Sequence, residues 1–205
     1  MAKITKPVCK VCRRNAEKLY LKGGRCESDK CPLDPRKQRK GMMAAKTSEF
    51  GLQLREKNKV KSYYGVFEKQ FRKYFSMAKK MKGVTGEILL RLLECRLDNV
   101  VYKLNWAFSR RMARQMVSHG HVFVNGKRVN RASYQVKIGD EISIGDNSRF
   151  LEIAKNARET GRATPVPVWL EASENEMKAK VVRYPTRDEV SIPVDEHLII
   201  NFYSK

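Results

Sequence analysis

Residues 109–130, SRRMARQMVSHGHVFVNGKRVN, constrain the fold most, because their periodicity changes from helical to extended within a few residues. At about 100° per residue, the apolar side chains up to Val117 fall on one side of a helix and three arginines on the other. Ser109 suits the N-cap, and Gly120 suits the left-handed position after the helix. The alternating residues that follow run into Asn125-Gly126, a strong signal for a tight β-hairpin. The segment predicts a short helix packed on a small antiparallel sheet.

The three arginines of this predicted helix, Arg110, Arg111 and Arg114, lie near its start. The backbone dipole is positive there, so a cation costs about 0.3–1 kcal/mol in the unbound helix. The same end offers N–H groups to an anion, and arginine side chains add bidentate contacts to phosphate. We therefore predict that these arginines bind phosphate groups. The alternative is that they pair with carboxylates such as Asp98 or Glu141.

The chain is strongly basic, with 43 Lys and Arg against 22 Asp and Glu, a net charge of +21 and a pI near 10.0. Residues 1–46 carry +10, 47–93 carry +7, 94–144 carry +5 and 145–205 carry −1. Such an excess indicates a polyanionic partner, either nucleic acid or an anionic membrane. The sequence has no long apolar run, and MAKITKPVCK does not resemble a leader peptide. We therefore expect a cytoplasmic protein that binds nucleic acid and has no membrane partner.

Four of the five cysteines lie near the start with the spacing C-x2-C-x13-C-x4-C: Cys9, Cys12, Cys26 and Cys31. Two close pairs separated by a loop can place four thiolates around a zinc ion at about 2.3 Å. Basic neighbours, including Arg13 and Arg14, favour the thiolate form that binds metal. We predict one structural Zn2+ ion, and an iron–sulfur cluster or free thiols remain the alternatives. Cys95, on a separate apolar stripe, is expected to be a buried core thiol.

Further short elements are expected along the rest of the chain. Thr47 or Ser48 should cap a helix that runs to about residue 61, and Thr85 should cap another. Apolar stripes predict helices along Phe67, Phe71, Phe75 and Ala78, and along Leu97, Val100, Val101 and Leu104. A strand pair is expected around Gly139-Asp140, and strands are expected around residues 166–170 and 177–184. Asp195 is expected to cap a last helix, for which a strand is the alternative.

Four stretches, in this order, resemble the family of the bacterial small-subunit ribosomal protein four. They are the four-cysteine start through LYLKG, LQLREKNKVKSYYGV at 52–66, RLDNVVYKLNWAFSRRMARQMVSHGHVFVNGKRV, and the terminal PVDEHLIINFYSK. One departure is the stretch PRKQRKG, where many relatives carry Pro-Gly-x-His-Gly. The RNA contacts of this connector, residues 33–46, therefore cannot be carried over from the family.

The resemblance implies an α+β fold, with a mostly helical body and an inserted small αβ RNA-binding module of two helices on an antiparallel sheet. The expected domains are a zinc-binding segment with a basic connector at 1–44, the helical body at 45–93 completed by a C-terminal helix at 194–205, and the module with its extension at 94–193. The implied function is structural: binding the 5′ domain of small-subunit ribosomal RNA, nucleating subunit assembly and contributing to decoding accuracy. The implied partners are small-subunit ribosomal proteins three and five, and messenger RNA where it enters the subunit. No small-molecule substrate is expected.

The resemblance also assigns RNA-binding residues by position. In the module they are Ser109, Arg110, Arg111, Arg114, Gln115, His119, Lys127 and Arg128. In the helical body they are Arg55, Lys57 and Lys59, and the basic first segment adds Arg13 and Arg14.

Two other functional classes compete with this interpretation. Arg96-Leu97-Asp98 is similar to the motif around the catalytic aspartate of some pseudouridine synthases, but only 61 residues follow position 144, too few for an added catalytic domain. The sequence contains no P-loop, dinucleotide fingerprint or HExxH motif. A zinc-bearing DNA-binding regulator would need an exposed recognition helix and usually a dimer. We therefore expect an RNA-binding protein without catalytic residues.

Overall fold

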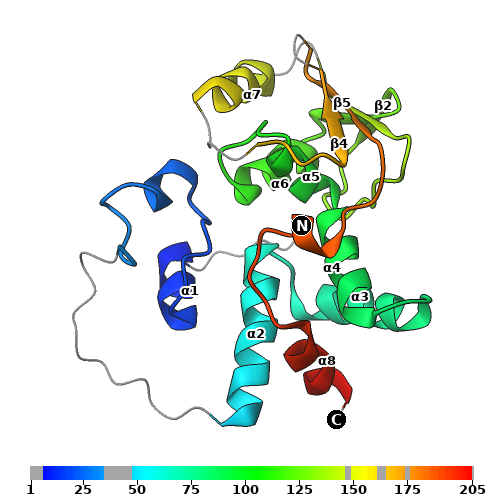
Figure 1. The fold of residues 1–205 in the computed structure, drawn as a ribbon. Coiled ribbons are helices and arrows are strands. Elements are labelled where there is room, and N and C mark those ends of the chain that lie inside the picture. The colour runs from blue at the N-terminus through cyan, green and yellow to red at the C-terminus, as the bar shows by residue number, and fades with distance from the viewer. Residues whose placement is uncertain (1–6, 35–47, 146–148, 161–164, 174–175, 205) are drawn as a thin grey trace. The chain divides into compact units, whose positions relative to one another are not determined.

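The structure is a computed structural model that describes residues 7–34, 48–145, 149–160, 165–173 and 176–204 (Figure 1). Its chain forms two compact units, one of Met1–Leu89 with Ser191–Lys205 and the other of Leu90–Val190. Apart from residues 33 and 34, the connector for which no RNA contacts were assigned lies outside the described residues. Each unit is considered by itself below.

The described part of the first unit is helical. It contains α1 (Val8–Asn15), the 3-10 turn η1 (Gly23–Cys26), α2 (Glu49–Tyr63), α3 (Glu68–Lys80), the start of α4 (Thr85–Glu94) and α8 (Glu196–Ser204). Ser48 caps α2, because its hydroxyl accepts a hydrogen bond from the Gly51 N–H at 3.2 Å. Asp195 precedes α8 and accepts from the His197 N–H at 3.0 Å. The last element is therefore a helix, as predicted, whereas α4 begins at Thr85 itself rather than after it.

Aromatic side chains hold α3 and α8 together. The Tyr203 ring lies 6.2 Å from the Phe71 ring and 4.6 Å from the Phe75 ring, measured between centroids. Phe71, Phe75 and Ala78 are buried, which confirms most of the predicted apolar stripe. Phe67 is 40% exposed, because it lies at the N-cap position of α3 and not within the helix.

The second unit is a layer of helices on a five-stranded antiparallel sheet. Its helices are the end of α4, α5 (Leu97–Lys103), α6 (Arg110–Ser118), α7 (Arg149–Thr160) and the 3-10 turn η3 (Arg187–Glu189). Its strands are β1 (Val122–Val124), β2 (Lys127–Val129), β3 (Glu141–Ile144), β4 (Leu170–Ala172) and β5 (Lys178–Val181), in the order β2-β1-β3-β5-β4. Asn125-Gly126 closes the predicted β1–β2 hairpin, and both residues have positive φ, as a tight turn requires.

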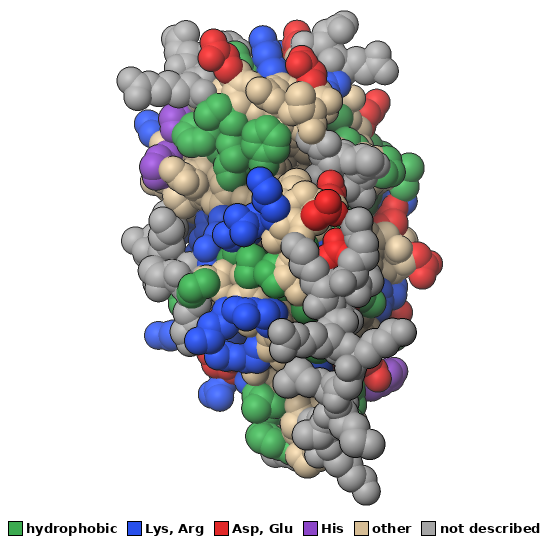
Figure 2. All heavy atoms as spheres, turned by 90° about the vertical axis from the view of Figure 1, so that its left-hand side faces the viewer, with side chains coloured by type: hydrophobic (Ala, Val, Ile, Leu, Met, Phe, Trp, Pro, Cys, Tyr) green, Lys and Arg blue, Asp and Glu red, His purple; other side chains and the backbone are tan. Residues whose placement is uncertain are grey.

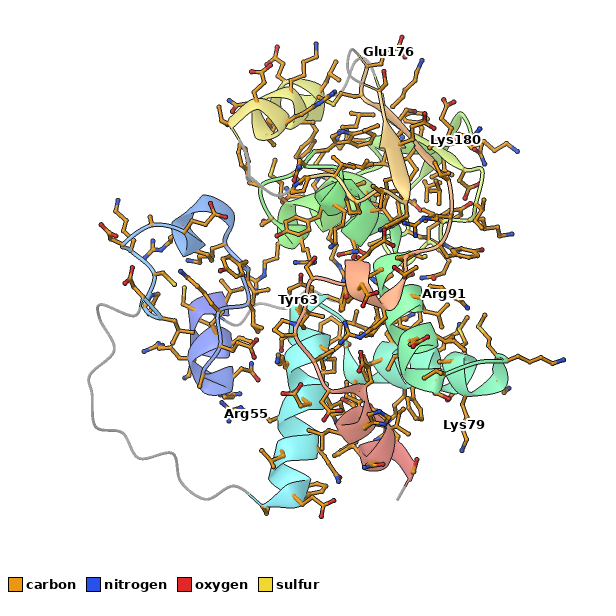
Figure 3. All side chains as sticks on the ribbon, in the orientation of Figure 1. Arg55, Tyr63, Lys79, Arg91, Glu176 and Lys180 are labelled. Atoms are coloured by element: carbon orange, nitrogen blue, oxygen red, sulfur yellow. The ribbon has the colours of Figure 1, made fainter. Side chains whose placement is uncertain are left out.

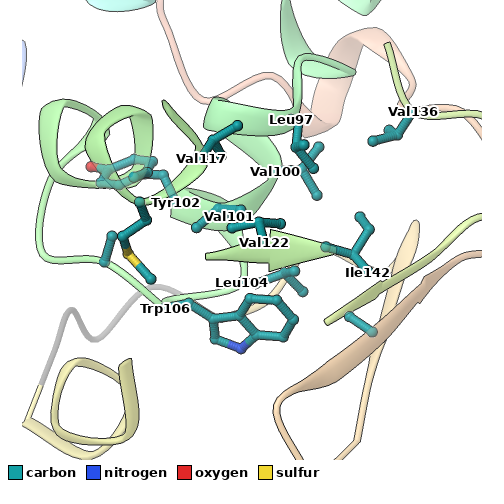
Figure 4. Packing of buried hydrophobic residues seen from close by; sticks show 14 of the residues in the cluster. Leu97, Val100, Val101, Tyr102, Leu104, Trp106, Val117, Val122, Val136 and Ile142 are labelled. Carbon is teal, nitrogen blue, oxygen red and sulfur yellow. The ribbon is translucent and has the colours of Figure 1, made fainter. Parts of the chain in front are cut away.

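The core of the second unit joins α5 and α6 to one face of the sheet (Figure 4). Val100 and Val101 of α5, Val117 of α6, Val122 of β1 and Ile142 of β3 are all fully or almost fully buried. Cys95 is also buried, as predicted, and burial raises the pKa of its thiol to about 12. Burial of this apolar surface stabilises the packing of α6 against the sheet and so fixes the position of the helix.

One prediction in the second unit is wrong. The segment before Gly139 does not form a hairpin with β3: the Val136 N–H donates to the Cys95 carbonyl, and β3 pairs with β1 and β5. No element was predicted for residues 149–160, where the structure has the helix α7. The strand predicted around 166–170 begins only at Leu170, and β5 occupies the middle of the stretch 177–184.

Among the helices of the described residues, none is both long and apolar enough to cross a bilayer.

Candidate nucleic-acid interface

The start of α6 is organised by Ser109. This residue is the N-cap, with extended backbone angles, and its side chain accepts a hydrogen bond from the Met112 N–H at 3.3 Å. The first turn of α6 contains no acidic residue, whereas α2, α3, α4, α5, α7 and α8 each have one there. The positive end of α6 is therefore not neutralised by a carboxylate in its own first turn.

The three arginines of α6 have different surroundings. The Arg110 side chain is half-buried and turns toward α5, where its Nε donates to Asn99 Oδ1 at 2.9 Å. Its guanidinium lies 4.2 Å from the centre of the Tyr102 ring, a cation–π distance. Arg111 is exposed. The sequence grouped these arginines together, and the structure separates them.

Arg114 illustrates the predicted alternative, pairing with a carboxylate. Its Nη1 lies 3.7 Å from Asp98 Oδ2, and its side chain is 29% exposed. The closer partner of Asp98 is Arg96, which donates at 3.0 Å from Nε and at 2.7 Å from Nη2. Since Arg96 and Asp98 are both almost fully buried, they form a desolvated ion pair beneath α6. Arg114 adds a longer contact at the edge of this pair.

The end of α6 meets the β1–β2 hairpin. Arg128 of β2 donates from Nη2 to the His119 carbonyl at 2.9 Å. Gly120 has φ +74°, a backbone conformation that favours glycine, and a Cβ there would displace the Arg128 guanidinium. Gln115, His119, Lys127 and Arg128 are all exposed. The structure thus brings these four predicted residues to the surface of one helix–hairpin unit.

His121 lies beside this group, in surroundings that disfavour its protonated form. Partial burial, and then the neighbouring His119 and Arg128, lower the pKa of its imidazole. Its ring packs 4.7 Å from Phe150, centroid to centroid. We therefore assign His121 to packing.

The basic residues of α2 are engaged within the first unit. Arg55 faces α1 and donates to the Asn15 carbonyl at 2.6 Å (Figure 3). Lys57 is buried, with its Nζ 3.2 Å from Glu68 Oε1 and 4.1 Å from the Phe202 ring centre. Lys59 is buried too, and its Nζ lies 2.7 Å from Glu17 Oε2. In this structure the two lysines contact carboxylates and not solvent.

The cysteine segment combines α1 and η1. Cys26 and Cys31 are buried, Cys9 and Cys12 are half-buried, and Arg13 and Arg14 are exposed at the end of α1. Burial raises the pKa of Cys12 and of Cys26; the charges of the other three cysteines raise the pKa of Cys12 further, and those of Cys31 and Cys9 raise the pKa of Cys26 further. The Lys22 N–H donates to Cys26 Sγ at 3.3 Å. The four thiols therefore share one neighbourhood and suit zinc chemically, although no three His, Cys, Asp or Glu side chains of the described residues converge closely enough to ligate a metal.

Two buried residues that support this surface were not predicted as site residues from the sequence. Asn99 and Tyr102 lie on the buried side of α5, and both contact Arg110. Helical periodicity places them on α5 but cannot show which helix packs across from them. In the view of Figure 2, Lys and Arg side chains gather in patches. Such patches are suited to a polyanion.

Comparison with known proteins decides the family. Residues 3–94 match the family model of the ribosomal protein S4/S9 N-terminal domain, and residues 95–142 match that of the S4 domain. The small ribosomal subunit protein uS4 of Natranaerobius thermophilus is 51% identical over 209 residues, and 100% of each chain is covered. The chain belongs to the uS4 family. The small ribosomal subunit proteins uS4 of Halothermothrix orenii and Acidobacterium capsulatum are 51% and 48% identical to this chain, again with both chains fully covered.

Membership of the uS4 family argues against the two competing functional classes, a pseudouridine synthase and a zinc-bearing DNA-binding regulator. These relatives are structural ribosomal proteins and not enzymes, so Asp98 has no counterpart role in pseudouridine synthesis. The buried ion pair with Arg96 accounts for Asp98 instead. The S4 domain match ends at residue 142, within β3, so it contains α5, α6 and the β1–β2 hairpin. All eight residues predicted to bind RNA in the second unit fall inside it.

Proposed function

We propose that this chain is a structural constituent of the small ribosomal subunit that binds ribosomal RNA through α6 and the β1–β2 hairpin. One observation carries the proposal. Within the matched S4 domain, the Ser109-capped start of α6 has no acidic residue, and Arg111, Lys127 and Arg128 are exposed on the same helix–hairpin unit. A helix N-terminus with adjacent arginines favours phosphate oxygens.

The finer assignment rests on the resemblance to the family. We propose that the RNA is the 5′ domain of small-subunit ribosomal RNA and that binding nucleates subunit assembly in the cytoplasm. Small-subunit ribosomal proteins three and five, and messenger RNA at its point of entry, are the proposed further partners, with an effect on decoding accuracy. The net charge of residues 145–205, −1, is consistent with protein partners for that part of the chain.

The experiment that tests RNA binding is a salt series. The purified chain is titrated with a 5′-domain transcript of small-subunit ribosomal RNA, an unrelated structured RNA of similar length and duplex DNA. Because phosphate contacts release counterions, all affinities fall as salt rises, and low salt hides specificity. We expect tight, saturable binding to the 5′-domain transcript that keeps its preference at physiological salt. Equal binding to all three nucleic acids would reject the proposal.

We also propose that Cys9, Cys12, Cys26 and Cys31 hold one Zn2+ ion. The support is the donor set: four thiols in one neighbourhood, two of them buried, with a backbone N–H on one sulfur. A bound zinc ion would tie α1 to η1 and keep the thiols deprotonated. Metal analysis of the purified chain should give about one zinc per molecule, with Cys26→Ser as the comparison. A wild-type chain that is folded and free of zinc would contradict this assignment.

A further inference from the structure

We propose that Arg110 is a positioning residue for RNA binding, held by Asn99 and Tyr102, and that Arg111 makes the direct phosphate contact at the start of α6. This inference rests on the proposed function and names the roles of two adjacent arginines. The two residues share charge and neighbourhood, but the structure gives them different contacts.

The surroundings of Arg110 are those of a packed side chain. Its guanidinium lies over the Tyr102 ring, and Tyr102 is only 1% exposed. Its Nε hydrogen is donated to Asn99, which is 2% exposed. Stacking on an aromatic face and a directed Nε hydrogen bond both use the planar geometry of arginine, which lysine lacks. These contacts join the first residue of α6 to the buried face of α5.

The orientation of Asn99 is fixed from its other side. Its Nδ2 donates to the Glu94 carbonyl at 3.0 Å and to Glu94 Oε2 at 2.6 Å. Since the amide nitrogen is committed to these two acceptors, Oδ1 must point away from Glu94 and toward Arg110. Glu94 is itself buried, with Lys103 Nζ 3.9 Å from its carboxylate. The end of α4, the first turn of α5 and the start of α6 are thus joined by one chain of hydrogen bonds.

This chain of contacts determines where the helix start points. Arg110 follows the N-cap residue Ser109 directly, so anchoring it fixes the first turn of α6. It also offsets the cost of a cation at the positive end of the helix, because the guanidinium charge lies against a ring face and an amide oxygen. Arg111, one residue later, is exposed, about 100° around the helix from Arg110. The anchored residue therefore orients the exposed one.

A salt series with lysine and alanine variants separates the two roles. The logarithm of affinity falls with the logarithm of salt concentration by about 0.7–0.9 for each phosphate contacted. Arg111→Ala should reduce this slope by that amount, and Arg111→Lys should keep it, because a phosphate contact needs only charge. Arg110→Ala and Arg110→Lys should both weaken RNA binding by about tenfold, which corresponds to the loss of one charge-assisted hydrogen bond. Neither variant should change the slope of affinity against salt. Full-length protein and the 5′-domain transcript are used throughout.

Two controls keep the result interpretable. Lys155→Ala removes an exposed charge from α7, outside the proposed interface, and should change neither affinity nor slope. Asn99→Ala should weaken binding as Arg110→Ala does, and the double variant should be no weaker than either single variant. Trp106 and Trp169 are buried in the second unit, so their fluorescence verifies that each variant is folded at the temperature used.

The outcomes distinguish this inference from the proposed function. If Arg110→Ala lowers the slope as Arg111→Ala does and Arg110→Lys binds like wild type, then Arg110 is itself a phosphate ligand and the inference is wrong. Wild-type binding by both Arg110 variants would also overturn it. In either case the preference of the wild-type chain for the 5′-domain transcript would leave the proposed function standing. Loss of that preference in the wild type would overturn the proposed function itself.

Discussion

Helices α2 and α6 are both basic and both were predicted to bind RNA, yet the structure treats their charges differently. On α2, Lys57 and Lys59 are buried against Glu68 and Glu17. On α6, Arg110 contacts the neutral groups of Asn99 and Tyr102, while Arg111 is exposed. The formal charge of a segment is therefore not the charge it presents. For the lysines of α2 and for Arg110 the difference lies in the neighbours described, since a carboxylate neutralises a cation and a neutral group only orients it. Arg114 of α6 resembles the lysines, because it contacts the Asp98 carboxylate.

The largest expected effect on the free energy of unfolding comes from breaking the buried ion pair between Arg96 and Asp98. Asp98→Ala leaves the Arg96 guanidinium, 2% exposed, without its carboxylate. Removing one partner of such a pair costs about 3–5 kcal/mol of unfolding free energy. Urea unfolding followed by tryptophan fluorescence measures this loss, because both tryptophans lie in the second unit. Unchanged stability would mean that Asp98 is not needed to neutralise Arg96.

A smaller loss of unfolding free energy is expected from removing a charge on α2. Lys59→Met keeps the length of the side chain but removes the charge that pairs with Glu17. Because the Glu17 side chain is 33% exposed and can be solvated, we expect a loss of about 1–2 kcal/mol, less than for a fully buried pair. Far-UV circular dichroism during urea unfolding measures the change. The salt slope of RNA binding should stay constant, and a decrease would show that Lys59 contacts phosphate after all.

Acid should weaken the first unit through Glu68. Burial raises the pKa of this carboxyl, but hydrogen bonds from Lys61, Tyr203 and Lys57 outweigh it and lower the pKa from 4.5 to about 2. A lowered folded-state pKa gives stability that is complete above about pH 4.5 and is lost as the pH falls toward 2. Since the side chain is 36% exposed, we expect about 1 kcal/mol after screening. Comparison of wild type with Glu68→Gln between these pH values isolates this contribution, and parallel pH profiles would exclude it.

The smallest effect on stability is expected in the hairpin. Lys127 is exposed on β2, so Lys127→Ala should change the unfolding free energy by no more than about 0.5 kcal/mol. If Lys127 contacts a phosphate, the same variant should reduce the salt slope by about 0.7–0.9. A stable variant with an unchanged slope would remove Lys127 from the interface.

Local patterns in the sequence predicted most of the elements that position the site. The Ser109 cap, the apolar face of α6 and the Asn125-Gly126 turn depend on residues close together in the chain, and all three are present. The hairpin predicted around Gly139-Asp140 failed because the segment before it pairs with Cys95 and Arg96, about forty residues away. Such a long-range partner leaves no local signal.

The functional roles of the basic residues were harder to predict for the same reason. The helical pattern placed Arg110 on the polar face of α6, and its contact with Tyr102 depends on how α5 packs. Lys57 lies in a polar stretch and is buried only because Glu68 and Phe202 come from other helices. Charge patterns show where a polyanion is expected to bind, and tertiary contacts decide which cations reach it.

The central claim is that a cation contributes to RNA binding only when the fold presents it. Its most direct test uses two double variants and the 5′-domain transcript, and compares how steeply the RNA affinity of each falls with salt. The first double variant combines Arg111→Ala and Lys127→Ala, and the second combines Lys57→Met and Lys59→Met. The first pair is exposed and the second is buried. We predict that the slope of the first falls by about 1.4–1.8, two phosphate contacts, while that of the second matches the wild type. Equal slopes for the two double variants, or a decrease only in the second, would contradict the claim.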